Sequence, residues 1–399
     1  MRKITASYLF TGRGNLIEKG VVITGDNGKI VSLSTAEQFD AAELETYEGV
    51  LCPGFINTHC HIELSHLKGR IAPKMGLANF LRPISRIRAE FSAEQIAAAI
   101  EQAEADMIRA GIVAVGDISN DNTSFVQKQR GNLRYHTFVE LFAPFGANLE
   151  ERCHARFEQA IAFWQQVPRC NGSTASLAPH APYTVATDLL RRIANFNAQN
   201  ELVGSIHHQE AACENDLFEY GTGDFVALYR DFGTDLAHHF TPIGKPSSAY
   251  IAENLPEKCK WLLVHNTFSQ QADLDRWKAK QKKIYWCLCP NANIYIENRL
   301  PDIDLFVQNQ AAVTIGTDSL SSNEQLCVLS ELKTISRHFP HIPLSMLLTW
   351  ATYNGAKALD YEEYLGSIAI GKCPGINLIE NIDMNALRLL PNSSVRRLV

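Results

Sequence analysis

The spacing of hydrophobic residues changes after about residue 50 of the chain. Residues 1–50 hold short apolar, β-branched runs separated by turn residues, as in the run 20–24 before the turn at 25–28. Such runs predict strands joined by tight turns. From Gly54 onward, short apolar runs alternate with longer segments in which apolar residues recur with the helical period. This alternation is typical of βαβ units and therefore of a parallel sheet.

Eight strand candidates and five longer helical segments lie between residues 54 and 338. The strands are predicted at Gly54–His61, Ile112–Ile118, Tyr135–Phe142, Ala175–His180, Val203–His208, Trp261–Thr267, Lys283–Pro290 and Ala312–Asp318. The helices are predicted at Ala93–Ala110, Arg156–Gln166, Thr187–Asn200, Gln270–Lys282 and Leu326–His338. Eight strands that alternate with helices over roughly 300 residues predict an α/β fold, a (β/α)8 TIM-type barrel.

The two ends of the chain lie outside this alternation. Residues from Gly366 onward return to short strand-like runs and turns. We expect them to pair with the N-terminal strands in one small β-sandwich domain. The expected division is 1–52 and 361–399 for the two parts of this β domain, and 53–360 for the barrel.

Composition narrows the class of partner. The 399 residues include 37 Lys and Arg against 43 Asp and Glu, a formal net charge of −6, which argues against a nucleic-acid partner or a polybasic membrane anchor. The apolar runs are far shorter than the roughly 20 residues of a membrane span. Ten cysteines without a Cys-x-x-Cys pair indicate reduced thiols rather than a disulfide framework. We expect a cytoplasmic protein, a homodimer, that acts on a small molecule.

Side chains suited to catalysis gather at the predicted C-terminal strand ends, where barrels of this type carry their chemistry. The residues at these ends are His59, His61, Asp117, Glu140, His180, His207, Glu210, His265, Asn291 and Asp318. Histidines scattered through a core would not select one edge so consistently. The pattern therefore predicts an active site at this end of the barrel.

The segment His59-Cys60-His61 is the sharpest signal for a metal. Residues two apart on a strand face the same way, so both imidazoles point into the barrel mouth. Alone, they could also form a satisfied polar pair. His207 and Asp318, at the ends of the fifth and eighth strands, would complete a set of three imidazoles and one carboxylate. That set suits zinc, or alternatively iron, with one position left open for water.

Two other kinds of metal site are disfavoured. A cytidine-deaminase site needs His-x-Glu followed by Pro-Cys-x-x-Cys, and only the first half occurs here, at 61–63. A two-metal barrel site would be bridged by a carboxylated lysine on a middle strand, but no lysine occurs from 129 to 244. A single metal ion is therefore expected.

Three further polar residues are relevant to this set. Glu210, three residues after His207, could move protons to and from the water, or could be a solvated acid at a helix start. Glu214, four residues further, is expected on the exposed helix face. His265 ends the sixth strand and is either a catalytic imidazole or a buried histidine bonded to the backbone.

Five segments, in chain order, carry a resemblance to a known family. They are Pro53–His61, His207–Glu210, Cys289–Asn293, Gly316–Ser319 and Thr352–Ala356. Over nearly the whole chain they resemble the amidohydrolase superfamily, in its cytosine deaminase and chlorohydrolase (ATZ/TRZ-like) branch. Within that branch, three segments are most similar to the 6-aminodeoxyfutalosine deaminases of the alternative menaquinone pathway; they are His61–Ser65, His180–Tyr183 and Asp318–Asn323.

The resemblance implies the roles of the site residues. The implied ligands of one divalent metal ion are His59, His61, His207 and Asp318. Glu210 and His265 would act on the hydrolytic water and on a ring nitrogen of the substrate, and Asp318 would accept the proton of that water. The implied substrate contacts are His180, Glu63 and Asn323. For Glu63, capping of its loop is an equal alternative.

The reaction that follows is hydrolysis of a carbon–nitrogen bond that is not a peptide bond, most simply deamination of an aminopurine. Hydrolysis of a cyclic amide, or loss of another leaving group from an azine ring, would use the same site. A non-catalytic barrel is disfavoured because such descendants usually lose ligands. The arginines after the first strand could pair with a substrate carboxylate or form an exposed basic face; they are Arg82, Arg86 and Arg88.

Overall fold

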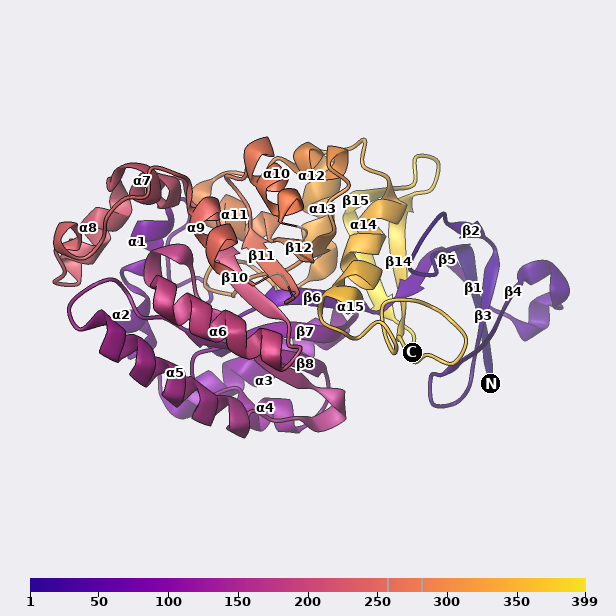
Figure 1. Ribbon diagram of the computed structural model, residues 1–399. Coiled ribbons are helices and arrows are strands. Elements are labelled where there is room, and N and C mark those ends of the chain that lie inside the picture. The colour runs from indigo at the N-terminus through magenta and orange to yellow at the C-terminus, as the bar shows by residue number, and fades with distance from the viewer. Residues whose placement is uncertain (257, 281–282) are drawn as a thin grey trace.

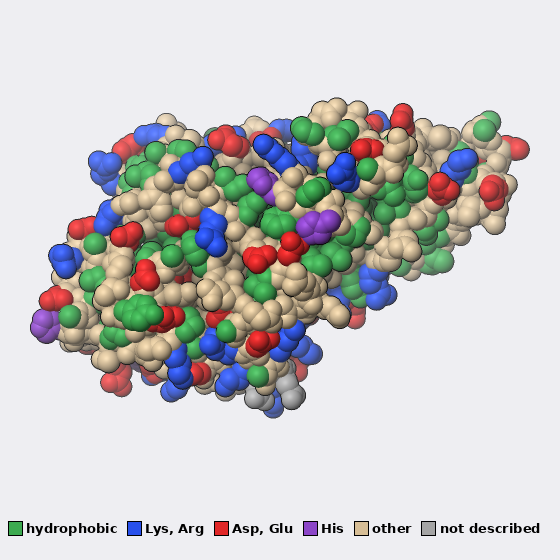
Figure 2. Space-filling model, turned by 90° about the horizontal axis from the view of Figure 1, so that it is seen from above, with side chains coloured by type: hydrophobic (Ala, Val, Ile, Leu, Met, Phe, Trp, Pro, Cys, Tyr) green, Lys and Arg blue, Asp and Glu red, His purple; other side chains and the backbone are tan. Residues whose placement is uncertain are grey.

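The computed structural model describes residues 1–256, 258–280 and 283–399. A wide body of strands ringed by helices narrows to a sheet that holds both ends of the chain (Figure 1). Lys, Arg, Asp and Glu side chains are interspersed over the face seen from above (Figure 2). Among the described helices, none has the length and apolar character needed to cross a bilayer.

All eight strands predicted for the barrel are present. They are β6 (Phe55–Cys60), β7 (Ile112–Ser119), β8 (Arg134–Leu141), β9 (Thr174–Pro179), β10 (Gly204–His208), β11 (Trp261–His265), β12 (Ile284–Leu288) and β13 (Val313–Ile315). Their residues are almost all buried, as expected for parallel strands that helices cover on one face and barrel side chains cover on the other.

The eight strands form two parallel four-stranded sheets, β6-β7-β8-β9 and β10-β11-β12-β13. Backbone hydrogen bonds join the two sheets at both seams. The His207 amide donates to the His180 carbonyl (3.0 Å), and the Thr317 amide donates to the His59 carbonyl (2.9 Å). The arrangement is TIM-like. The hydrogen bonds of both seams lie at the C-terminal ends of the strands, and the predicted ligands lie there as well.

The five longer predicted helices are also present. They are α3 (Ala93–Arg109), α5 (Leu149–Gln166), α6 (Thr187–Gln199), α10 (Gln271–Ala279) and α13 (Val328–His338). Helix α5 begins seven residues before the predicted start at Arg156, and its first turn carries Glu150 and Glu151, which the helix dipole favours. Residues 281–282, at the end of the predicted helix Gln270–Lys282, lie outside the described residues.

Shorter helices fill the connections around the barrel mouth and the outer ring. They are α1 (Leu77–Leu81), α2 (Ile84–Arg88), α4 (Phe125–Gln129), α7 (Ala212–Tyr220), α8 (Asp224–Asp231), α9 (Ser247–Asn254), α11 (Pro290–Glu297), α12 (Ile303–Gln308), α14 (Leu344–Thr349) and α15 (Gly355–Ala358). Helices α1 and α2 come directly after the first barrel strand and its 3-10 turn, so they lie over the site rather than beside a strand.

Strands from both ends of the chain pair in one seven-stranded sheet, as the sequence predicts. In spatial order its main path is β15 (Arg388–Arg397), β14 (Ile376–Asp383), β5 (Glu45–Pro53), β1 (Arg2–Leu9), β3 (Gly20–Thr24) and β4 (Ile30–Thr35), with β2 (Ile17–Glu18) paired to β1. Strand β5 pairs with β1 and β14, and only Gly54 separates it from β6. The terminal sheet is thereby tied directly to the first barrel strand.

Candidate metal centre and active site

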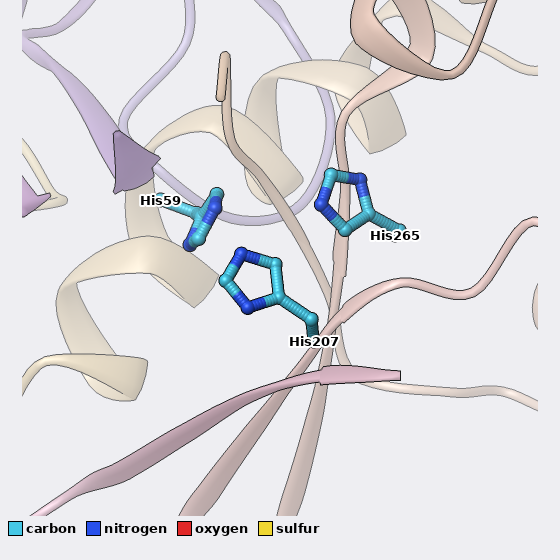
Figure 3. Close-up of side chains that lie close together, drawn as sticks. All are labelled: His59, His207 and His265. Atoms are coloured by element: carbon cyan, nitrogen blue, oxygen red, sulfur yellow. The ribbon is translucent and has the colours of Figure 1, made fainter. Parts of the chain in front are cut away.

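The four predicted ligands converge from three strands. His59 lies on β6 and His61 directly follows it, His207 lies on β10, and Asp318 follows β13. The Oδ1 atom of Asp318 lies 3.5 Å from His59 Nε2 and 3.4 Å from His61 Nε2, and the two Nε2 atoms are 3.2 Å apart. His59 also shares a second cluster, with His207 and His265, whose rings face one point in Figure 3. Within each cluster the ligand atoms lie within 4.8 Å of one another.

This donor set fits a divalent metal ion. Three imidazoles and one carboxylate, all buried, are ligands that zinc and iron both accept. The Nδ1 atom of His207 lies 2.7 Å from the His180 carbonyl oxygen, to which it donates, so Nε2 faces the cluster with its lone pair free. Such a second contact of a ligating histidine fixes both the tautomer and the ring orientation.

Burial sets the protonation states that ligation requires. It lowers the pKa of His61 to about 3 and that of His265 to about 4, and it lowers the pKa of His207 well below its ordinary value. Burial alone would raise the pKa of Asp318, but the hydrogen bond with His59 and the nearby imidazoles hold that pKa below its ordinary value. His61 and His207 are therefore neutral and Asp318 is ionised, as metal ligands are.

Backbone strain concentrates at the same place. Gln209, His265 and Asp318 have φ values of 46°, 76° and 57°, in the left-handed region that non-glycine residues rarely adopt. Gln209 directly follows β10, His265 ends β11, and Asp318 lies three residues after the end of β13. Strained residues of this kind persist where surrounding contacts hold them, and they cluster at active sites.

Glu210 and His265 face each other beside the ligands. Glu210 Oε1 lies 3.5 Å from His265 Nε2, and the other ring nitrogen of His265, Nδ1, lies 3.0 Å from Asn293 Oδ1. Burial, reinforced by the charge of Asp318, raises the pKa of Glu210 well above its ordinary value. This buried carboxyl group is therefore not the solvated acid of a helix start, and its raised pKa favours the protonated form, which can donate a proton.

The prediction that Glu214 lies on an exposed helix face is wrong. Glu214 is fully buried instead. Its carboxylate accepts hydrogen bonds from the Gln209 amide (2.9 Å) and from Ser247 Oγ (2.6 Å). The Glu214 side chain thus holds the turn that carries Glu210. Because one of its partners, Ser247, lies on α9, the spacing of residues within α7 could not reveal this contact.

A cavity of about 360 Å³ opens above the ligands. Its floor holds His61, His207, Glu210, His265 and Asp318. Its walls are mainly apolar, with side chains from α1, α2 and the segments after β8 and α8; they include Leu77, Phe80, Leu81, Ile84, Phe142 and Phe232. A concave apolar pocket with a few converging polar groups is the usual form of a small-molecule site.

The predicted substrate contacts separate into two groups. His180 and Glu63 line the cavity. Glu63 is buried and also accepts hydrogen bonds from the backbone amide (3.0 Å) and side-chain amide (3.1 Å) of Asn120, which is the loop-capping alternative. Asn323 is not among the lining residues, and its amide nitrogen donates to the Thr317 carbonyl and to Glu331. The structure therefore does not bring Asn323 to the cavity.

Of the three arginines considered, only Arg88 lines the cavity. It pairs with Asp121 and lies 3.7 Å from Glu63, so two carboxylates already face it. Arg82 pairs with Asp231 at 2.7 Å, and Arg86 is exposed. The basic face predicted for this segment is thus divided among separate ion pairs.

Two residues that line the cavity received no catalytic or binding role from the sequence. Glu140 is the last residue but one of β8, its Oε1 lies 3.7 Å from His207 Nδ1, and burial raises its pKa to about 8. Its position at a strand end was a usable signal. Phe232 follows α8 and is 66% exposed, and no pattern in the sequence connects it with a barrel mouth.

Comparison with known proteins gives evidence on the family of this chain that is independent of the site geometry. A family model described as the amidohydrolase family matches residues 50–395. Adenosine deaminase of Helicobacter pylori is 27% identical over 316 residues, 78% of this chain and 74% of that protein. 5-Methylthioadenosine/S-adenosylhomocysteine deaminase of Bacillus cereus (strain AH820) is 25% identical over 379 residues, 90% and 80% of the two chains. The crystal structure of Helicobacter pylori aminofutalosine deaminase with methylthio-coformycin superposes with a TM-score of 0.80 at 25% identity, covering 96% and 93%.

Proposed function

The chain belongs to the amidohydrolase family, and on this premise we propose that it hydrolyses the exocyclic C–N bond of an adenosine-like substrate, releasing ammonia. The observation that carries the proposal is the cavity floor, where the proposed ligands lie beside Glu210, a buried carboxyl group with a raised pKa. The relatives named adenosine deaminase and aminofutalosine deaminase support this choice of bond.

The ligands proposed for one metal ion are His59, His61, His207 and Asp318, with zinc as the first choice and iron as the alternative. A bound divalent ion lowers the pKa of a coordinated water toward about 7. The chain's own contribution is to keep His61 and His207 neutral and Asp318 ionised.

The proton transfers are assigned to two carboxyl groups. Asp318, ionised, accepts a proton from the attacking water, and Glu210, protonated, donates one to the ring nitrogen next to the reacting carbon. The amidine carbon becomes more electrophilic and the C–O bond forms. The C–N bond then breaks as ammonia leaves with the proton from Asp318, and the hydroxyl proton returns to Glu210. His265 donates from Nδ1 to Asn293 Oδ1, so the neutral ring presents the lone pair of Nε2, which accepts a hydrogen bond from the attacking water and orients it.

The substrate class follows from the apolar walls. Phe80, Ile84, Phe142 and Phe232 offer contact area to an apolar group on the end of the nucleoside remote from the reacting ring. A substrate like 6-aminodeoxyfutalosine or a 5′-thioadenosine fits this division into a polar floor and apolar walls. His180 and Glu63 are the proposed polar contacts to such a substrate. A place in menaquinone biosynthesis is proposed on the same ground.

Ammonia release from protein of known metal content tests the proposal. The substrates are adenine, adenosine, 5′-methylthioadenosine and 6-aminodeoxyfutalosine, with guanine and cytosine as outgroups. Release from an adenine nucleoside, with about one metal per chain and lost in Asp318→Asn, would support it. The exposed Asp275→Asn is the matched control and should retain activity. Silence of metal-loaded protein across the panel would overturn deamination and favour a cyclic amide or another leaving group.

We also propose a division of the chain into a barrel and a small β domain. The barrel would span 53–360, and residues 1–52 and 361–399 would make the small β-sandwich domain, with the boundary where β5 passes into β6. The homodimer and the cytoplasmic location stay predictions. Sedimentation velocity and fractionation of cells would test them.

A further inference from the structure

One buried ion pair next to the ligands has no part in the reaction described above. Lys128 on α4 and Asp117 on β7 meet at 2.6 Å between Nζ and Oδ2, and their side chains are only 2% and 0% exposed. Lys128 Nζ also donates to Ser119 Oγ (2.9 Å) and Thr137 Oγ1 (3.1 Å). The buried ammonium group thus has one ionic partner and two hydrogen-bond acceptors, the kind of compensation that a buried lysine requires.

Stability alone is a weak reason for such a pair. Removing two charges from water is costly, and well-packed apolar residues of the same volume often serve a fold as well or better. The position of the pair within the barrel is more informative, because Asp117 has a second partner.

Asp117 binds the chain directly after a ligand. Its Oδ1 accepts a hydrogen bond of 2.8 Å from the Ile62 amide, while Oδ2 faces Lys128. In the β6–β7 ladder, Asp117 is aligned with Cys60, and the register shifts just before this position. The carboxylate therefore spans the place where regular pairing between the two strands ends.

His61 depends on that place. It lies beyond the end of β6, with φ −124° and ψ 79°, outside the geometry of the strand. The Ile62 amide bonded to Asp117 fixes the direction in which the backbone leaves His61. The Cα–Cβ bond of His61, and with it the approach of Nε2 to Asp318, follows from that direction.

We propose that Asp117 and Lys128 are a positioning pair for the metal centre: Lys128 holds the Asp117 carboxylate, Asp117 holds the Ile62 amide, and the ligand His61 is oriented as a result. Neither residue lines the cavity or touches the ligand atoms, so their effect is on how well the site binds its metal. The inference rests on the proposed metal site.

The test measures zinc affinity by competition with a chromophoric chelator, together with the melting temperature of the metal-free protein. Asp117→Ala removes the acceptor for Ile62, and we expect affinity to fall about 10- to 100-fold, the usual effect of losing a contact that orients a ligand. Lys128→Met leaves the carboxylate without its partner, and we expect a loss of similar size. With excess zinc, activity should recover much of the way.

Two further variants separate positioning from folding. The neutral double variant Asp117→Asn with Lys128→Met keeps an oxygen that can accept from Ile62, and its affinity should stay within a few-fold of the wild type. Asn197→Ala is the matched control: this buried side chain on α6 accepts from the Leu177 amide (3.2 Å) and donates to the Leu177 carbonyl (2.7 Å) on β9, and its loss should lower the melting temperature but not the affinity.

Wild-type affinity in Asp117→Ala would overturn the positioning role, as would a loss of affinity in the double variant equal to that in Asp117→Ala. If Asp117→Ala does not fold, Lys128→Met and the double variant carry the same comparison. Failure of the wild-type protein to bind zinc or iron at all would instead refute the metal site itself, and that result is distinguishable from the others.

Discussion

Replacing Glu210 by Gln tests the proposed proton donor with almost no change of shape. Glutamine keeps the volume and a hydrogen-bond donor but has no proton to transfer. A positioned general acid contributes about 10²- to 10⁴-fold, so kcat should fall by that factor, which corresponds to about 3 to 5 kcal/mol in the barrier. Metal content should stay at the wild-type level because Glu210 belongs to none of the ligand clusters among the described residues.

The same variant should lose activity without losing stability, because of the raised pKa of Glu210. Burial raises this pKa in the folded protein, so wild-type stability declines as the pH rises toward and through the folded-state pKa, starting above the ordinary glutamate pKa. Glutamine stays neutral and escapes this loss. Metal-free Glu210→Gln should therefore melt no lower than the wild type at pH 8, although it is nearly inactive.

The measurements are ammonia release, metal content and thermal melting at pH 6 and pH 8. The exposed Glu253→Gln on α9 serves as the control and should match the wild type in all three. An unchanged kcat in Glu210→Gln would refute the proton-donor role. Loss of the metal in this variant would show that Glu210 acts as a ligand instead.

Three other predictions concern the metal, the packing behind it and the cavity wall. Chelation should lower the melting temperature and zinc should restore it, by about 4 kcal/mol of stability when free zinc exceeds its Kd about 1,000-fold; calorimetry at several zinc concentrations checks this, and a transition independent of zinc would contradict it. Gly316→Ala would place a methyl group 2.8 Å from His59 Cβ and Cys287 Sγ, so we expect a loss of about 1 to 3 kcal/mol in urea unfolding and weaker zinc binding. Phe232→Ala should leave stability within about 0.5 kcal/mol because the ring is largely exposed, but should raise KM for 5′-methylthioadenosine more than for adenosine; an equal change for both would exclude contact with the 5′ group.

Most of the barrel strands, and the convergence of the proposed ligands, could be predicted because both follow short, local rules. Apolar runs of strand length recur at regular intervals, and alternation along a strand predicts that His59 and His61 face one side; their Nε2 atoms do meet, although His61 lies just beyond the end of β6. Parallel strands bring their C-terminal ends to one edge, so ligands 259 positions apart, His59 and Asp318, meet without any local signal between them.

The errors come from residues whose environment is set by distant segments. Glu214 has the spacing of a surface residue, yet Ser247 on α9 and the turn at Gln209 enclose it. Asn323 lies close to Asp318 in sequence, but Glu331 draws its amide away from the cavity. Helical and strand periods describe one element at a time, and these contacts are formed between elements.

The proposed reaction depends on two carboxyl groups in one cavity, Asp318 and Glu210, whose pKa values shift in opposite directions. Both are buried, and burial by itself would raise the pKa of each. Asp318 sits among imidazoles and keeps its charge, while Glu210 faces the negative charge of Asp318 and keeps its proton. One group can therefore accept a proton and the other donate one at the same pH, which is how paired carboxyl groups divide acid and base roles. Because the charge on Asp318 helps to hold the proton on Glu210, Asp318→Asn should lower the pKa of Glu210 as well as remove a ligand. Titration of Glu210 by carbon-13 NMR in metal-free Asp318→Asn would detect that shift, and an unchanged pKa would show that burial alone protonates Glu210.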